Sequence, residues 1–332
     1  MSSFLITFLV ALSCSILLLY LYLILGSKFK IYDIPNNRSS HKNSVIRGGG
    51  IVLLLINIIW VIFDPSQLNI LLSVSLSIGV VTGFLDDFKN LKTITRFILY
   101  LIAVGIILFG VLELQRFDTY IWIPLFIIIL GAVNAYNFMD GINGITALYS
   151  IVISCSSLFI LNSLNEFTFN ENIISYAGFF VAFCIFNFRN RALMFLGDSG
   201  SVTMGLFAAF LVVLIGLKIN SWSSIILLAV YGVDSVGSII IRLIKRENIL
   251  QAHRSHLYQE LVHIKSYNHL TISVLYSFVQ LFINVGLFVF YHLGWVEFYA
   301  GGILLLLAFL YYYVKQKIHG DNLFLKDNIA IE

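Results

Sequence analysis

Long apolar runs separated by short polar stretches make up most of the chain. Eleven of these runs approach the length of about 20 residues that a helix needs to cross a bilayer. The runs are continuous and do not alternate between apolar and polar residues, so they predict helices and not the strands of a barrel. The second and seventh runs are the shortest. The expected helices cover residues 4–26, 48–63, 68–85, 95–114, 120–138, 142–161, 173–188, 201–217, 224–244, 270–291 and 296–314.

Composition favours a membrane protein over a soluble one. Of the 332 residues, 59% are apolar and 11% are charged, and the mean hydropathy is +0.94. Soluble domains have roughly 45–50% apolar and about 25% charged residues. The sequence therefore predicts an all-α, polytopic membrane protein that forms one integral membrane domain over residues 1–332.

The basic residues predict the orientation. When the connections between the runs are numbered alternately, one set holds 18 of the 20 lysine and arginine residues, and the other holds only Arg116 and Lys218. Cytoplasmic loops carry such an excess of positive charge. We therefore expect the N-terminus outside, the C-terminus in the cytoplasm, and the protein in a bacterial inner membrane.

Five polar motifs fall at the ends of runs on the basic, expected cytoplasmic side. They are RSSHKNSVIRGGG (38–50), GFLDDFKN (83–90), NFMDGING (137–144), FLGDSGS (195–201) and AHRSHLYQE (252–260).

The first acidic positions are Asp86 and Asp87, at the end of the third run. The helix dipole disfavours negative charge there, so the pair is either a solvated helix end or a metal ligand beside a general base. Asp140 lies in a short turn, where it either forms an Asx turn or cap or binds a ligand. Because we expect Asn143 to cap the sixth helix, Asp140 is the freer of the two for binding.

The last acidic position is Asp198, in a glycine-flanked turn that opens the eighth helix. Such a turn either caps the helix or binds phosphate or Mg²⁺ and phosphate. Arg189 and Arg191 stand just upstream as candidate phosphate ligands.

Basic side chains and one further acid complete the candidates. His253, Arg254 and His256 lack a third ligand at zinc spacing, so phosphate binding through the arginine fits them better. Arg47 precedes three glycines, which are typical either of close helix packing or of an anion-binding entry. Asp234 lies inside the ninth run and is either a functional acid or a partner in an ion pair with a neighbouring helix.

Together the motifs predict phosphoryl-type transfer. Carboxylates with a divalent ion, and arginine and histidine nearby, suit a diphosphate substrate. A site at the membrane surface indicates one soluble and one lipid substrate. The sequence has no Walker A pattern, so nucleotide hydrolysis is not expected.

The motifs HKNSVIRGGGI, GFLDDFKNL, NAYNFMDGINGI, FLGDSGS and HRSHLYQ resemble, in this order, those of the polyprenyl-phosphate N-acetylhexosamine-1-phosphate transferases, over residues 38–260 and with an eleven-helix layout. The HRSH form is similar to the branch that initiates O-antigen and related surface glycans. The phospho-MurNAc-pentapeptide transferases have a different, His-rich final motif.

The resemblance implies transfer of a sugar-1-phosphate from a UDP-N-acetylated sugar to undecaprenyl phosphate, with release of UMP. It implies Mg²⁺, or Mn²⁺ in its place, as cofactor. The expected partners are these two substrates, membrane lipid and a second copy in a homodimer, and no nucleic acid.

The resemblance also assigns roles. Asp86 is the expected base, or in an older proposal a covalent nucleophile; Asp86, Asp87 and Asp140 are the catalytic set, and Asp198 with Asp87 the metal ligands. We assign substrate binding to Asn137, Arg47, Arg191, His253, Arg254 and His256.

Two positions depart from the family pattern. Ser44, Val45 and Ile46 stand where members often have a proline before Arg-Gly-Gly. Asn143 replaces the second aspartate of a DGxDG turn and carries no charge, so it is not expected to be a metal ligand.

Three other functions compete with this interpretation. A transporter would place acids at the bilayer midplane, often in inverted repeats, whereas only Asp234 lies within a run and no internal repeat is visible. A phospho-MurNAc-pentapeptide transferase is the alternative within the enzyme class. A non-enzymatic membrane scaffold would not need three acidic turns and an HRSH loop.

Overall fold

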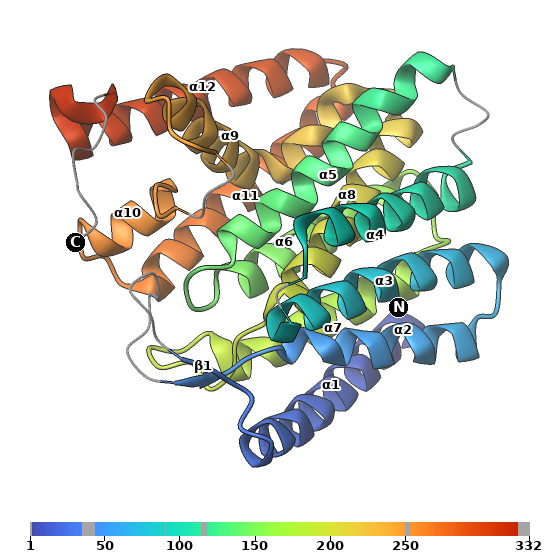
Figure 1. The fold of residues 1–332 in the computed structure, drawn as a ribbon. Coiled ribbons are helices and arrows are strands. Elements are labelled where there is room, and N and C mark those ends of the chain that lie inside the picture. Colours follow the sequence, from blue (N-terminus) through green and yellow to red (C-terminus); the bar gives the residue numbers. More distant parts are fainter. Residues whose placement is uncertain (1, 35–43, 90, 114–117, 250–252, 325–332) are drawn as a thin grey trace.

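The computed structural model describes residues 2–34, 44–89, 91–113, 118–249 and 253–324, and this part of the chain is almost entirely helical (Figure 1). The helices form one bundle, with α1 along one edge and α12 along the opposite edge. The α-helices are α1 (Ser2–Lys28), α2 (Val52–Phe63), α3 (Gln67–Lys89), α4 (Thr93–Gly105), α5 (Trp122–Met139), α6 (Ile145–Ser163), α7 (Asn170–Asn187), α8 (Asp198–Ile219), α9 (Ala229–Ile244), α10 (Leu257–His263), α11 (His269–His292) and α12 (Val296–His319).

Short segments of tighter or wider helix extend several of these helices. They are the 3₁₀ turns η1 (Gly49–Ile51), η4 (Thr119–Ile121), η5 (Trp222–Leu228) and η6 (Gly320–Phe324), and the π-helical turn η2 (Ile106–Val111). With these extensions all eleven predicted helices are present. The largest difference lies at the end of α12, predicted at 314 and observed at His319.

Nine helices in the described residues are long and apolar enough to cross a membrane. The other two of the predicted eleven are the ones that were shortest in the sequence. One is α2, whose apolar stretch Gly49–Phe63 is shorter than a full span. The other is α7, whose first turn carries the polar side chains of Asn170, Glu171 and Asn172. The chain is therefore a multi-pass, all-α membrane protein.

Helix α8 forms the centre of the bundle. Its residues from Ser199 to Ile215 are all buried, and it packs against α3, α5 and α6. The helix is apolar on every side, as expected for a helix surrounded by others. The polar start of α7 is satisfied across the bundle, because the Asn172 amide donates to Oδ1 of Asn69 at 2.9 Å.

Glycines let three segments meet where α8 begins. A Cβ added to Gly83 of α3 would overlap the backbone of Asp198, and one added to Gly50 of η1 would overlap the backbone of Gly200. The Gly50 N–H donates to the carbonyl of Leu196 at 2.8 Å. The glycine run after Arg47 therefore serves close packing, one of the two interpretations the sequence left open.

The helix ends that carry the five motifs lie at one end of the bundle. There the strand β1 (Tyr32–Asp33) pairs antiparallel with β2 (Val45–Ile46), and Ile46 bridges to Met194 beside the 195–201 motif. The same end carries α10, a helix that the sequence did not predict; β1 and α10 both lie on the left in Figure 1. Residues 35–43, including part of the first motif, lie outside the described residues. The compartment that this end faces stays a prediction.

We predict that Gly83→Ala lowers the free energy of unfolding by about 1–3 kcal/mol, since the added methyl group overpacks the contact with α8. Thermal unfolding in detergent measures the loss. The matched control is Gly131→Ala in α5, where an added Cβ meets nothing within 4 Å. Equal stability of the two variants would contradict the close approach of α3 and α8.

Candidate functional site

Asp87 lies near the end of α3, and its carboxylate sits at the start of α8. Its side chain is fully buried, with Oδ1 2.6 Å from Nη2 of Arg47 and accepting the Asp198 N–H at 3.2 Å. The dipole of α3 disfavours a negative charge here, whereas the N-terminus of α8 stabilises it. Oδ2 of Asp87 is buried without a hydrogen-bond partner in the described part of the chain.

Asp86 faces a different partner. Its Oδ2 lies 2.5 Å from Nη1 of Arg96 in the first turns of α4, and its Oδ1 accepts the Leu91 N–H at 2.7 Å. The two adjacent carboxylates are thus each held by an arginine, and the arginines come from different segments. This arrangement replaces the solvated helix end that the sequence left open, because Asp86 is only 8% exposed.

Asp198 and Asp140 bring further carboxyl groups to the same place. The Asp198 carboxylate interacts with the side chains of Asn137 and Asp86. Burial raises the pKa of Asp140 to about 7; the nearby Thr146 side chain opposes the rise, and repulsion from Asp198 adds to it. Residues from three separate motifs therefore meet in one acidic cluster.

Arg47 is the cation that faces this cluster. Burial lowers the pKa of Arg47, but the carboxylates of Asp87, Asp198 and Asp33 outweigh it and bring the pKa above its usual value. The arginine thus stays charged at the junction of β2 and η1. The departure at Ser44–Ile46 coincides with β2, which supports Arg47 from the N-terminal side.

The donors in the cluster fit a magnesium ion. Within the described ranges no group of three or more His, Cys, Asp or Glu side chains is placed to hold a metal together. Mg²⁺ needs fewer protein ligands, because it keeps several waters and binds one or two carboxylates plus substrate phosphates. The free Oδ2 of Asp87 and the Asp198 carboxylate match that donor set.

Asn143 does not cap α6, and that prediction was wrong. The N-cap is Gly144, whose N–H donates to Oδ1 of Asn187 at 2.6 Å. The Asn143 amide instead donates to the carbonyl of Arg189 at 2.7 Å, while its backbone carbonyl accepts the Ser273 hydroxyl at 2.8 Å. An aspartate cannot donate in this way, so the departure from the family pattern has a structural reason.

Asp234 anchors the start of α10. It lies in α9, is 2% exposed, and its oxygens accept the N–H groups of Leu257 and Tyr258 at 2.7 and 3.2 Å. The Tyr276 hydroxyl donates to it at 2.8 Å, and Nδ1 of His256 lies 3.6 Å away. The acid inside the ninth helix therefore connects that helix to the HRSH segment, residues 253–256.

His253 and Arg254, like Ser255, are half-buried, whereas His256 is buried. Burial and the neighbouring His256 and Arg242 side chains lower the pKa of His253 to about 3. His253 is thus neutral near pH 7, able to donate one hydrogen bond and accept another. Arg254 is left as the permanent cation beside it.

Arg191 is separate from the acidic cluster. It is exposed, as is Arg189, in the connection between α7 and α8. No ion pair joins Arg191 to the carboxylates among the residues that the structure describes. Its proposed contact with substrate phosphate stays a prediction.

Three residues that support the site lie outside the sequence motifs. Arg96 holds Asp86, Asn187 caps the turn before α6, and Lys315 of α12 contacts the Ser255 carbonyl. Each is a polar side chain at the end of an apolar run on the same side as the motifs. That shared location is the signal by which the sequence could have indicated them.

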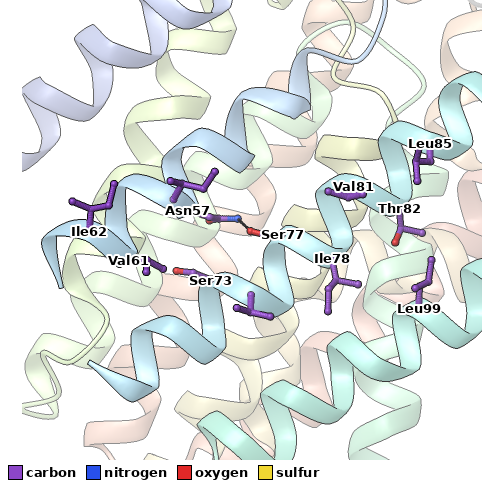
Figure 2. A pocket seen from close by; sticks show the side chains of 12 residues that line it. Asn57, Val61, Ile62, Ser73, Ser77, Ile78, Val81, Thr82, Leu85 and Leu99 are labelled. Carbon is purple, nitrogen blue, oxygen red and sulfur yellow. Dashed lines mark hydrogen bonds between the residues drawn. The ribbon is translucent and has the colours of Figure 1, made fainter. Parts of the chain in front are cut away.

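An apolar groove runs beside the site on the outer face of α2, α3 and α4 (Figure 2). Its volume is about 570 Å³. The exposed side chains of Ile62, Val74 and Val81 line it, and it ends at Leu85 and Leu99. Leu85 precedes Asp86, so a hydrocarbon chain lying in this groove would end beside the carboxylates.

Comparison with known proteins shows which family the central part of the chain resembles. The family model for glycosyl transferase family 4 matches residues 68–216, a range that holds the Asp86, Asp140 and Asp198 motifs. A probable undecaprenyl-phosphate N-acetylglucosaminyl 1-phosphate transferase of Bacillus subtilis is 25% identical over 270 residues, which are 75% of this chain and 74% of the relative. Residues 68–216 of the chain are thus similar to glycosyl transferase family 4, and the relative supports the transferase family that the motifs resemble.

Two further relatives of the chain are phospho-N-acetylmuramoyl-pentapeptide-transferases. The protein of Caldanaerobacter subterraneus is 28% identical over 197 residues, covering 52% of the chain and 61% of the relative. The protein of Thermotoga maritima is 31% identical over 179 residues, covering 47% and 56%. The match thus spans less than two thirds of the length of either transferase.

We predict that Asn143→Asp lowers the free energy of unfolding by about 1–3 kcal/mol, because it removes a buried donor and sets a carboxylate against the Arg189 carbonyl. Thermal unfolding in detergent tests this. Asn165→Asp, the same change at an exposed position between α6 and α7, is the control. An Asn143→Asp protein as stable as the control would exclude the structural explanation of this departure.

Proposed function

We propose that this chain transfers N-acetylhexosamine-1-phosphate from a UDP-sugar to undecaprenyl phosphate and releases UMP. The observation that carries the proposal is the acidic cluster of Asp86, Asp87 and Asp198, which converges with Arg47 and Arg96 at one end of a membrane bundle. Such a cluster suits a charged diphosphate substrate and a divalent ion. Its place at the bundle end suits a lipid acceptor.

The proposed chemistry is a displacement at phosphorus. An oxygen of the lipid phosphate attacks the phosphorus that carries the sugar, the bond to the bridging oxygen breaks, and UMP leaves. A proton on the attacking phosphate passes to Asp86, whose carboxylate Arg96 and the Leu91 N–H hold in one orientation. Arg254 and His253 bind the diphosphate or the sugar, and Asn137 and Asp140 bind the nucleotide or the metal.

Asp87 and Asp198 would hold Mg²⁺, or Mn²⁺ in its place. The ion supplies neutralisation of the charge that develops on the diphosphate. Arg47 keeps Asp87 oriented, so that its free Oδ2 stays directed away from the ion pair.

We infer GlcNAc as the first sugar to test, because the Bacillus subtilis relative is named for N-acetylglucosamine. The pathway would be synthesis of O-antigen or a related surface glycan, with the site facing the cytoplasm at the inner membrane. The second candidate is transfer of phospho-MurNAc-pentapeptide, which the other relatives carry out. The HRSH motif favours the first.

The test is release of UMP by detergent-solubilised protein with undecaprenyl phosphate and Mg²⁺. The donors are UDP-GlcNAc, UDP-GalNAc, UDP-QuiNAc, UDP-FucNAc and UDP-MurNAc-pentapeptide. We expect release with an N-acetylhexosamine donor that needs the lipid, stops with EDTA and falls about a hundredfold or more in Asp86→Asn. Release only from the pentapeptide donor would assign the second candidate, and no release from any donor by folded protein would reject the transferase.

We predict that Asp198→Asn abolishes turnover without unfolding the protein, because it removes a metal-binding charge and keeps the shape of the side chain. Thermal unfolding and UMP release are measured side by side. Turnover like that of the unchanged protein would remove Asp198 from the metal site.

A further inference from the structure

Buried ionisable residues of α10 and α12 contact the HRSH segment, and the proposed reaction does not use them. Lys315, near the end of α12, is 2% exposed, and its Nζ lies 2.7 Å from Oε1 of Glu260 in α10. The same Nζ donates to the backbone carbonyl of Ser255. His319, one turn further along α12, lies 3.0 Å from the other Glu260 oxygen. The end of the last helix is thus joined directly to the HRSH segment.

We propose that Lys315 and Glu260 are positioning residues, and that together with Asp234 they fix the HRSH segment in the shape that binds the nucleotide sugar. This inference rests on the proposed transferase function and deepens it. The three residues are here called the buried clamp.

The buried clamp binds backbone groups on both sides of His256. Lys315 binds the carbonyl of Ser255, and Asp234 accepts the N–H groups of Leu257 and Tyr258. Glu260, in the same short helix, pairs with Lys315. The clamp therefore acts on the backbone before and after His256.

The clamp also sets the segment against the acidic cluster. The Tyr258 hydroxyl donates to the carbonyl of Phe138 at 2.8 Å, two residues before Asp140. The Phe138 ring stacks on His256 with ring centres 5.7 Å apart. A Cβ on Gly141 would meet the Tyr258 ring, so this turn and α10 are in close contact. A shift of α10 would move His253 and Arg254 relative to Asp140.

A buried ion pair points to such a role more than to stability. Well-packed apolar residues can replace buried ion pairs at little cost in stability, whereas charged groups that must pair specify one arrangement. Lys315 and Glu260 are both nearly fully buried at a bundle end that carries the whole candidate site. The pairing of these two buried charges therefore suits residues that fix the position of the HRSH segment.

The experiment compares Lys315→Met with Lys317→Met in full-length protein. Lys317 lies in the same helix, is exposed, and stacks over the Tyr313 ring, with its Nζ 4.8 Å from the ring centre. The KM for the UDP-sugar, the KM for undecaprenyl phosphate, kcat and the hydrogen exchange of residues 253–263 are measured for each. We expect Lys315→Met to raise the KM for the UDP-sugar at least tenfold, with little change in the KM for the lipid. The Leu257 and Tyr258 amides should exchange faster, and Lys317→Met should match the unchanged protein.

A second variant covers the case in which Lys315→Met does not fold because the buried Glu260 loses its lysine partner. Lys315→Met/Glu260→Gln removes the charge pair without stranding a buried carboxylate. We expect it to fold and to show the same rise in the KM for the UDP-sugar. Unchanged KM and exchange in either folded variant would overturn the proposal. So would an equal effect on both substrates that follows the loss of thermal stability.

Failure of this inference is distinguishable from failure of the proposed function. If the unchanged protein releases no UMP from any donor, the transferase proposal fails, while hydrogen exchange still decides whether the clamp holds the segment. If the unchanged protein is active and Lys315→Met behaves like Lys317→Met, the clamp proposal fails alone.

Discussion

The buried carboxylate of Asp87 is the contact on which the arrangement of the site depends. It is paired with Arg47 and accepts the Asp198 N–H, so one side chain joins η1, α3 and α8. A buried charge must be paired, because an unpaired one is very costly. The glycines of α3 and η1 permit the short distances that this pairing needs. The charge that is unfavourable at the end of α3 is favourable at the start of α8, so the meeting of the two helix ends stabilises the Asp87 carboxylate.

The acidic cluster and the HRSH segment are built by different halves of the bundle. The cluster depends on α3, α4 and α8, whereas the HRSH segment depends on α9, α10 and α12. The turn that contains Asp140 lies between them: Asn143 donates to the carbonyl of Arg189 on one side, and Tyr258 reaches the carbonyl of Phe138 on the other. This turn therefore sets the distance between the two parts of the site.

Much of this architecture follows from residue patterns, and the remainder depends on tertiary contacts. Runs of apolar residues locate the helices to within a few residues, and the motif order indicates the family. The sequence places Asp86 and Asp87 together but cannot assign Arg96 to one and Arg47 to the other, because the pairing depends on how α3 is rotated. The capping role expected of Asn143 belongs to Asn187, which is distant in sequence. In the sequence, Lys315 does not differ from other basic residues at helix ends. Only the packing of α12 on α10 shows that it is buried.

The glycine contact has a consequence for how the site can change by substitution. At Gly50 and Gly83 the Cβ of any other residue would overlap backbone atoms. Even a substitution to alanine is therefore unfavourable at these two positions. The backbone around the acidic cluster therefore tolerates few amino-acid substitutions. Residues 253–255 are only half-buried, so evolution or an engineer seeking a different sugar has more freedom there, on a reaction centre that stays the same.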